Sequence, residues 1–199
     1  MDKTVARLNI EHFRKLLATE MDGVKRQTIV RLLAEEEKKL AALMGGPIIN
    51  HNRAPRTHKH LDEILSMAMT ELGASKGNIQ LLSRNGETLF IAAQRGFGHD
   101  FLDYFRAVSA RDNCACGYAL REQKRIIIED VTTDDSFASM RPIARAAGFR
   151  AVQSTPLIGR DNQPIGMLST HFHSKHRPSE HDFKRLAPYI DQAVDRAVE

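Results

Sequence analysis

The sequence predicts an α+β fold in which antiparallel β-hairpins combine with amphipathic helices, preceded by an N-terminal helical hairpin. The clearest observation is Asn85-Gly86, the strongest short signal for a tight hairpin turn, which lies between the β-prone residues 78–83 and 87–95. A second turn-forming run, GRDNQ, separates two longer β-prone segments within residues 149–172. Apolar residues recur at helical spacing in several other segments, and these predict the helices.

Composition limits the classes of partner. The chain has 199 residues, of which 42% are hydrophobic, so it can bury a substantial core. Its 29 Lys and Arg residues exceed the 25 Asp and Glu residues only slightly and are scattered, so we expect no nucleic-acid partner. We find no leader peptide and no apolar run near the length of about 18 residues that spans a bilayer. We therefore expect a cytoplasmic protein without a membrane partner.

Residues 1–46 are predicted to form the helical hairpin. Asn9 is a plausible N-cap for its first helix and Asp22 for its second, and Glu35 precedes Lys39 by four residues on the outer face. Neither helix can bury its apolar stripe alone. The hairpin therefore either packs on its own chain or joins a second copy in a four-helix contact. We expect a homodimer built from this hairpin and from the helices that flank the sheet.

A linker at residues 47–56 is predicted to join the hairpin to the main domain, residues 57–199. The linker has no periodicity and contains two turn-prone residues. An amphipathic helix opens the main domain and should end at Gly73. The last helix, residues 179–198, should begin with Ser179 as its cap and should bend at its internal proline.

The segment 112–172 has the composition of a pocket wall, because polar residues interrupt otherwise apolar segments. A short helix should follow a cap at Asp112 or Asn113. Three consecutive isoleucines mark residues 125–131 as a strand covered on both faces. Residues 134–147 should form a helical segment that crosses the sheet, and the antiparallel pair of strands follows it.

Three stretches of this segment resemble the second half of a GAF domain: ACGYALREQKRIIIEDV, DDSFASMRPIARAAGFRAVQSTPLI and PIGMLSTHFHSKHRPSE. The similarity extends over roughly residues 57–199 and is closest to the GAF modules of bacterial sensor histidine kinases. It implies a GAF/PAS-like antiparallel sheet with flanking helices. It also implies a signal-transduction module that binds a small molecule or a partner protein, with a histidine kinase or another output protein as its partner. The family does not fix the ligand.

Cys114 and Cys116 lie at a predicted helix start, where a thiolate is favoured. One enzyme branch of the GAF superfamily, the reductases of free methionine sulfoxide, uses cysteines, and Cys116-Gly117 with Ala119 resembles one of its motifs. That branch needs further cysteines in other loops, where this chain offers Met140 and its neighbours. We therefore expect buried packing residues, with redox or metal sensing as the alternative. Two cysteines one residue apart cannot join distant segments, which argues for a reducing compartment.

His171, His173 and His176 form an HxHxxH pattern, but we expect no metal and no cofactor. On a strand His171 and His173 share a face, whereas His176 falls in the following turn. No thiol or carboxylate is close in sequence to complete a tetrahedral set. The resemblance implies instead that His176 and Arg177 stabilise the turn before the last helix.

The predicted ligand-binding residues combine buried polar groups with apolar walls. They are Phe97, Cys114, Cys116, Asp130, Phe137, Met140, Arg141, Gln153, Thr155, Ser169 and His171. Buried polar groups must pair with one another, with the backbone or with a ligand. Arg141 would bind an anionic ligand group unless a carboxylate such as Asp130 pairs with it.

No catalytic residues are predicted, because the sequence shows no Ser-His-Asp order, phosphate-binding glycine loop or paired carboxylates. The sequence therefore favours a non-enzymatic sensing module that acts as a dimer. The alternatives are a cysteine-based free methionine sulfoxide reductase and a dimerisation scaffold that binds no small molecule.

Overall fold

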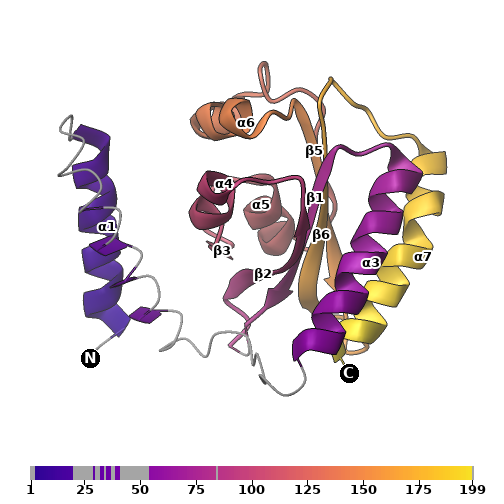
Figure 1. Cartoon of the computed structure of the whole chain (residues 1–199), viewed down its shortest axis with the longest axis horizontal. Coiled ribbons are helices and arrows are strands. Elements are labelled where there is room, and N and C mark those ends of the chain that lie inside the picture. The colour runs from indigo at the N-terminus through magenta and orange to yellow at the C-terminus, as the bar shows by residue number, and fades with distance from the viewer. Residues whose placement is uncertain are drawn as a thin grey trace. The chain divides into compact units, whose positions relative to one another are not determined.

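A computed structural model describes residues 3–19, 29, 32, 33, 35, 36, 39, 40, 54–83 and 85–198. The chain divides into two compact units, Met1–Ile48 and Ile49–Glu199 (Figure 1). The finer division predicted from the sequence, with a linker at 47–56, stays a prediction.

Helix α1 (Lys3–Thr19) is the main described element of the first unit. Asn9 lies inside this helix rather than at its start, because the helix begins earlier than the sequence predicted. Its Nδ2 donates a hydrogen bond to Glu36 Oε2 at 3.1 Å, and Lys39 Nζ donates to Glu36 Oε1 at 2.6 Å. The described residues of the predicted second helix are all helical, and the rest of it, including Asp22, lies outside the described residues.

The second unit is built on a six-stranded sheet with strand order β3-β2-β1-β6-β5-β4, in which all neighbours are antiparallel. The strands are β1 (Lys76–Leu82), β2 (Thr88–Arg95), β3 (Ala107–Ser109), β4 (Ile126–Ile128), β5 (Ala151–Ile158) and β6 (Pro164–Phe172). Both predicted hairpins, β1 with β2 and β5 with β6, are confirmed. Gly86 has φ +72° in the first turn, a conformation that glycine adopts at no steric cost.

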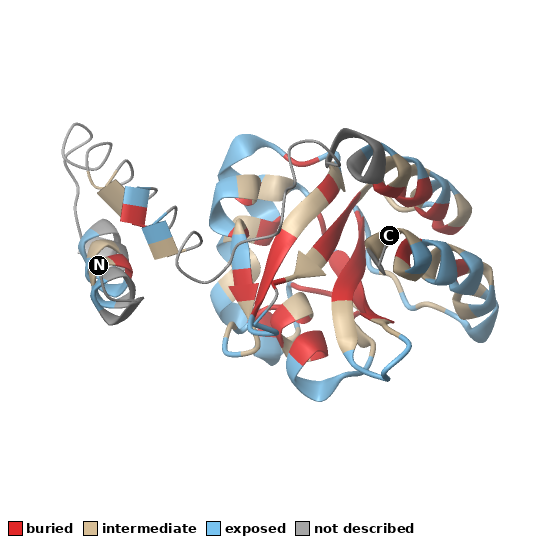
Figure 2. Cartoon of the chain, turned by 90° about the horizontal axis from the view of Figure 1, so that it is seen from below, coloured by how far each residue is buried: buried red, intermediate tan, exposed pale blue. Residues whose placement is uncertain are grey.

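Helices cover both faces of the sheet (Figure 1). They are α3 (Ala54–Leu72), α4 (His99–Tyr104), α5 (Ala115–Glu122), the 3₁₀ helix η1 (Asp135–Met140), α6 (Arg141–Ala147) and α7 (Glu180–Val198). Helices α3 and α7 lie side by side on one face, and the shorter helices lie on the other. Figure 2 shows that buried residues concentrate along the strands and on the inward sides of the helices.

Strand alternation divides the buried residues into two cores. Leu61, Ile79, Leu168 and Leu186 belong to the core between the sheet and α3 with α7. The other core, on the opposite face, contains several phenylalanines together with Cys114 and Met167. Because neighbouring residues of a strand point to opposite faces, the four long strands β1, β2, β5 and β6 contribute to both cores.

Two sequence predictions differ from the fold. Among the described residues, strand β4 pairs only with β5 and so lies at the edge of the sheet, and its Ile126 and Ile127 are partly exposed. The prediction that this strand is covered on both faces is therefore wrong, because an apolar run alone does not distinguish a central strand from a partly covered edge strand. The single helical segment predicted at 134–147 is divided into η1 and α6, with a proline in the first turn of α6.

The last helix begins as predicted. Ser179 donates from its N–H and from its hydroxyl to Asp182 Oδ2, at 2.7 and 2.8 Å, and Ser179 Oγ accepts from the Asp182 N–H. This reciprocal pairing is a capping box, which fixes the start of α7. Within the described part of the chain, no helix has both the length and the apolar character needed to cross a membrane.

Candidate ligand-binding cavity

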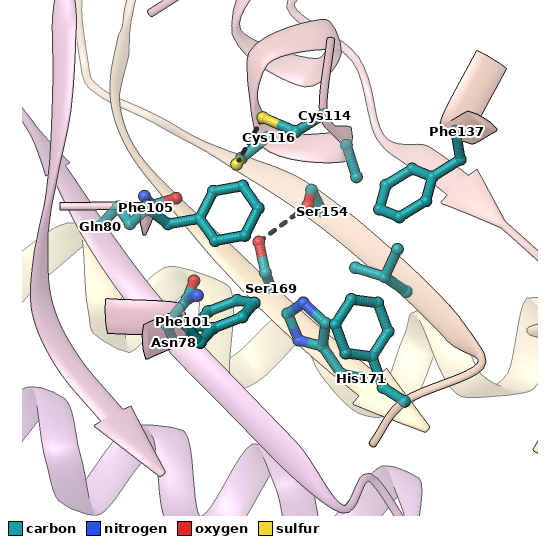
Figure 3. A pocket seen from close by; sticks show the side chains of 13 residues that line it. Asn78, Gln80, Phe101, Phe105, Cys114, Cys116, Phe137, Ser154, Ser169 and His171 are labelled. Carbon is teal, nitrogen blue, oxygen red and sulfur yellow. Dashed lines mark hydrogen bonds between the residues drawn. The ribbon is translucent and has the colours of Figure 1, made fainter. Parts of the chain in front are cut away.

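A small cavity lies on the face of the sheet that α4, α5 and η1 cover (Figure 3). Its volume is about 20 Å³, which is room for roughly one water molecule. It is lined by Asn78, Gln80, Phe101, Phe105, Cys114, Ala115, Cys116, Phe137, Phe149, Val152, Ser154, Ser169 and His171. None of these side chains is a carboxylate, an ammonium or a guanidinium group.

Three adjacent strands supply the polar side chains of the lining. Asn78 and Gln80 lie two residues apart on β1, as do Ser169 and His171 on β6, so each pair points to one face of the sheet. Ser154 of β5 is paired with Ser169, and the two hydroxyl oxygens are 2.8 Å apart. The β1–β2 register shifts between Ile79 and Gln80, and such bulges commonly re-aim side chains beside functional sites.

His171 is enclosed by aromatic rings. The ring centroid of Phe149 lies 4.7 Å from that of His171, the centroid of Phe97 lies 4.9 Å away, and both rings meet the imidazole edge to face. Burial, together with the positive charge of Lys76, lowers the pKa of His171 to about 3. The imidazole is therefore neutral at physiological pH and presents one donor and one acceptor.

Several buried polar atoms of the lining have no hydrogen-bond partner among the described residues. They are Asn78 Oδ1, Gln80 Oε1 and Nε2, and His171 Nδ1. A buried polar group without a partner costs about 1–3 kcal/mol, so such groups are rare and call for an explanation. Here they occur together on one wall of one cavity.

Cys114 and Cys116 lie on the opposite wall, and their sulfur atoms are 3.5 Å apart (Figure 3). Cys114 is the N-cap of α5 in extended conformation, whereas the sequence predicted Asp112 or Asn113 as the cap. Asp112 instead accepts a hydrogen bond from the Ser109 N–H at 2.7 Å. Hydrogen bonds from the Cys116 thiol and from backbone N–H groups lower the pKa of Cys114. The hydrogen bond to Cys114, with burial, raises the pKa of Cys116 well above its usual value.

The structure brings part of the predicted ligand-binding set together. Cys114, Cys116, Phe137, Ser169 and His171 all line the cavity. Phe97 is not part of the lining, but its ring stacks on that of the lining residue Phe101 with a centroid separation of 3.7 Å. Sequence reasoning missed several lining residues, namely Asn78, Gln80, Phe101, Phe105, Phe149 and Ser154.

Gln153 and Thr155 do not line the cavity, in contrast to the sequence prediction. They point to the other face of the sheet, where Thr155 Oγ1 accepts a hydrogen bond from Arg125 Nε at 2.9 Å. The residue between them, Ser154, faces the cavity. The side-chain period of a strand is two, so an error of one residue in the register moves every side chain to the wrong face. Extending the alternation from the predicted Ser169 across the hairpin would have selected Ser154.

Arg141 and Met140 also lie outside the lining. Arg141 Nε donates to the Val131 carbonyl and its Nη2 donates to the Asp134 carbonyl, both at 3.1 Å. Tyr104 Oη donates to the sulfur of Met140 at 3.6 Å. The Arg141 guanidinium therefore donates its hydrogen bonds to backbone carbonyls of the segment before η1, and it does not point into the cavity to bind an anionic ligand.

Asp130 forms an ion pair that tightens the turn after β4. Arg150 donates from Nε and Nη2 to its two carboxylate oxygens, at 3.1 and 2.7 Å, and the Thr132 N–H donates at 3.0 Å. Asp130 therefore pairs with Arg150 and not with Arg141. The hydrogen bonds from Arg150 and Thr132 hold the pKa of Asp130 well below its usual range.

Asp130→Asn should lower the thermal midpoint at pH 7 and should flatten its acid dependence. A carboxyl whose pKa is depressed in the folded state stabilises the fold above its unfolded pKa of about 4, and this contribution disappears as the pH falls toward the folded pKa. Melting curves measured from pH 7 down to acid conditions test this expectation. The exposed Asp191→Asn serves as the control, and a parallel pH dependence in wild type and Asp130→Asn would contradict the assignment.

The other two histidines of the HxHxxH pattern do not line the cavity with His171. His173 Nδ1 is hydrogen-bonded to the Gly148 carbonyl at 2.8 Å. The His176 ring stacks on Phe172 with a centroid separation of 3.7 Å, and the backbone N–H of His176 donates to the Glu129 carbonyl. Among the residues that the structure describes, no three His, Cys, Asp or Glu side chains converge to hold a metal ion.

Comparison with known proteins identifies the fold. The GAF domain region of a Geobacter sulfurreducens PCA protein is 16% identical, with a TM-score of 0.64, over 74% of this chain and 97% of that chain. A domain of a Sinorhizobium meliloti 1021 protein described as a two-component sensor histidine kinase is 17% identical, with a TM-score of 0.53, over 69% and 88%. The type II free methionine-R-sulfoxide reductase from Thermoplasma acidophilum is 14% identical, with a TM-score of 0.58, over 72% and 94%.

These identities are low enough that the solved structures support the fold alone. Among curated protein sequences, none matches this chain significantly. A family model described as GAF domain, however, matches residues 40–195, which is most of the sequence. The chain therefore belongs to the GAF domain family.

Proposed function

We propose that this GAF domain is a non-enzymatic sensing module that binds a small uncharged molecule in the cavity and passes the signal to an output protein such as a histidine kinase. One observation carries the proposal. Asn78, Gln80 and His171 present buried hydrogen-bonding atoms without partners to a cavity whose lining contains no charged side chain. A ligand with complementary donors and acceptors would remove their desolvation penalty.

The lining favours a planar ligand that carries an amide or a similar neutral group. Asn78 and Gln80 each offer amide atoms, while Phe101, Phe105 and Phe137 provide flat apolar surface. An anionic ligand would have to leave water without an opposing cation, because Arg141 lies elsewhere. For this reason the anionic ligand class expected from the sequence is not part of the proposal.

A ligand of several heavy atoms requires the cavity to open, since ligand pockets usually measure about 300–1,000 Å³. Helix α4 is the element best placed to move. It has only six residues, no side chain caps its start, and it carries Phe101 over the cavity. Gly96, with φ +83°, and Gly98 precede it and supply a hinge. Ligand entry would thus displace α4 and Phe101, which provides a conformational signal.

Dimerisation through the N-terminal hairpin and the helices that flank the sheet stays a prediction, as does the cytoplasmic location. The exposed apolar side chains of Val5 and Leu8 on α1 and of Met67 on α3 support a partner for these helices. A homodimer would cover them, and a kinase or another output protein would receive the signal from the same helices.

Native mass spectrometry of gently purified full-length protein tests both parts of the proposal. We expect the mass of a dimer together with an added small-molecule mass that is released when the protein is denatured. A protein that is monomeric at every accessible concentration would contradict the predicted dimer. A released molecule that carries a carboxylate or a phosphate would contradict the uncharged ligand class.

The reductase alternative rests on one observation, the contact between Cys114 and Cys116 on the cavity wall. On the sensing proposal the protein does not reduce free methionine-R-sulfoxide. A turnover assay with that substrate decides the question, because activity that is lost in Cys116→Ser would replace the sensing proposal with an enzymatic one.

A further inference from the structure

We propose that Cys114 and Cys116 form a reversible dithiol–disulfide switch that small peroxides oxidise. Their sulfur atoms are 3.5 Å apart, both side chains line the cavity, and neither cysteine is in a disulfide in this structure. The inference does not depend on the sensing proposal, because it concerns the thiols themselves and not the molecule that Asn78 and Gln80 would bind.

The local backbone holds the two thiols together. Cys114 precedes α5 in extended conformation, with φ −133° and ψ 164°, and Cys116 lies in the first turn of the helix. Gly117 follows directly and approaches the Asp112 carbonyl so closely that a Cβ atom there would lie 2.3 Å from it. The backbone at this corner therefore keeps the two sulfurs close, and closing the bond of about 2.0 Å requires the side chains to rotate toward each other.

The two cysteines have unequal roles. The thiol of Cys116 and backbone N–H groups stabilise the thiolate of Cys114, whereas the proximity of Cys114 and burial keep the proton on Cys116. Because the thiolate is the nucleophile, Cys114 is the residue that a peroxide oxidises first. Cys116 is the resolving thiol.

The chemistry balances with one peroxide for each pair. The Cys114 thiolate attacks one oxygen of hydrogen peroxide, the O–O bond breaks, and the sulfur becomes a sulfenic acid while hydroxide leaves and takes up a proton as water. The Cys116 sulfur then attacks the sulfenic sulfur, the S–O bond breaks, and the thiol proton leaves with the hydroxyl group as water. Two thiols and one peroxide thus give one disulfide and two waters, and two electrons pass from sulfur to oxygen.

The surroundings suit a small oxidant and a reversible product. The cavity beside the thiols admits a molecule of about the size of water, and Cys114, which is otherwise buried, lines this cavity. A disulfide between residues only two positions apart closes a small, strained ring. Strained disulfides are the readily reduced ones, so a cellular dithiol would return the pair to its reduced form.

The test is oxidation of the reduced full-length protein with one equivalent of hydrogen peroxide, followed by thiol alkylation and peptide mass spectrometry. We expect one disulfide between Cys114 and Cys116 within a single chain, no alkylated cysteine, and complete reversal by dithiothreitol. Reading the cysteine peptide separates this product from oxidation of the methionines. Thiols that persist under conditions that oxidise free cysteine would overturn the proposal, as would a disulfide between chains.

Two serine variants test the order of events, because serine keeps a hydrogen-bonding group at each position. Cys116→Ser should accumulate a sulfenic acid at Cys114, which dimedone traps. Cys114→Ser should react with peroxide at least about fivefold more slowly than Cys116→Ser. Equal rates would contradict the assignment of Cys114 as the nucleophile. The wild-type measurement still decides whether the disulfide forms if either variant folds poorly.

Discussion

Phe137→Ala is expected to lower the free energy of unfolding by about 3–5 kcal/mol. Phe137 is 2% exposed and is the largest fully buried side chain among the described residues. Its ring packs against that of Phe149 with a centroid separation of 6.4 Å. Its removal both loses apolar burial and enlarges the cavity, since η1 is held in place by backbone contacts that the substitution leaves intact. Urea denaturation of the variant measures the loss.

The enlarged site supplies a second measurement for the same variant. Removal of the Phe137 ring leaves apolar space beside the cavity that benzene can fill, so benzene should raise the thermal midpoint of Phe137→Ala but not that of the wild type. Tyr104→Ala is the control, since Tyr104 is 51% exposed and its replacement should cost less than about 1 kcal/mol. Equal losses in the two variants would show that Phe137 is not a core residue of the cavity.

Gly117→Ala should destabilise the protein by about 3 kcal/mol, because the added methyl group would clash with backbone atoms, which cannot move aside as a flexible side chain could. A Cβ atom at this position would lie 2.3 Å from the Asp112 carbonyl oxygen and 2.9 Å from that of Ser109. Both contacts are with backbone, so the start of α5 would have to shift, and Cys114 and Cys116 would shift with it. Thermal unfolding gives the size of the effect.

Gly98→Ala is the matched control for this substitution. Gly98 has φ −85° and a Cβ atom there would meet nothing within 4 Å, so alanine should be neutral or stabilising by up to about 1 kcal/mol. If Gly117→Ala and Gly98→Ala have the same melting temperature, close packing at the start of α5 does not explain the glycine at position 117.

The sequence predicted the fold well where local chemistry determines structure. Asn85-Gly86 and the GRDNQ run marked both hairpins, and Ser179 marked the start of α7. Strand β3 was missed because its three residues, Ala107–Ser109, are too few to show a period. The edge position of β4 was missed because it depends on the order of strands, which no short segment contains.

The site was harder to predict, because it depends on which strand face meets which helix. Choosing Gln153 and Thr155 instead of Ser154 was an error of one residue in a pattern of period two. The role expected for Arg141 was changed by partners that are remote from any sequence motif, since Val131 and Asp134 engage it through their carbonyl groups. Asn78 and Gln80 carried no motif, although alternation along β1 places them on one face.

The central claim is that the polar wall of the cavity binds an uncharged ligand, and a pair of glutamine variants tests it most directly. Gln80 and Gln153 are both almost fully buried, and both amides lack hydrogen-bond partners among the described residues. Gln80 lines the cavity, whereas Gln153 lies on the opposite face of the sheet with Ala151 and Leu157, which belong to the core against α3 and α7. Replacing either with leucine removes an unpaired buried amide, so neither variant should be less stable than the wild type.

The measurement is the thermal shift caused by small aromatic amides and by their matched carboxylates, beginning with benzamide and benzoate. We predict that the amides raise the melting temperature of the wild type and of Gln153→Leu, that Gln80→Leu loses this response, and that the carboxylates produce none. A response to benzoate as large as that to benzamide, or a full amide response in Gln80→Leu, would contradict the account.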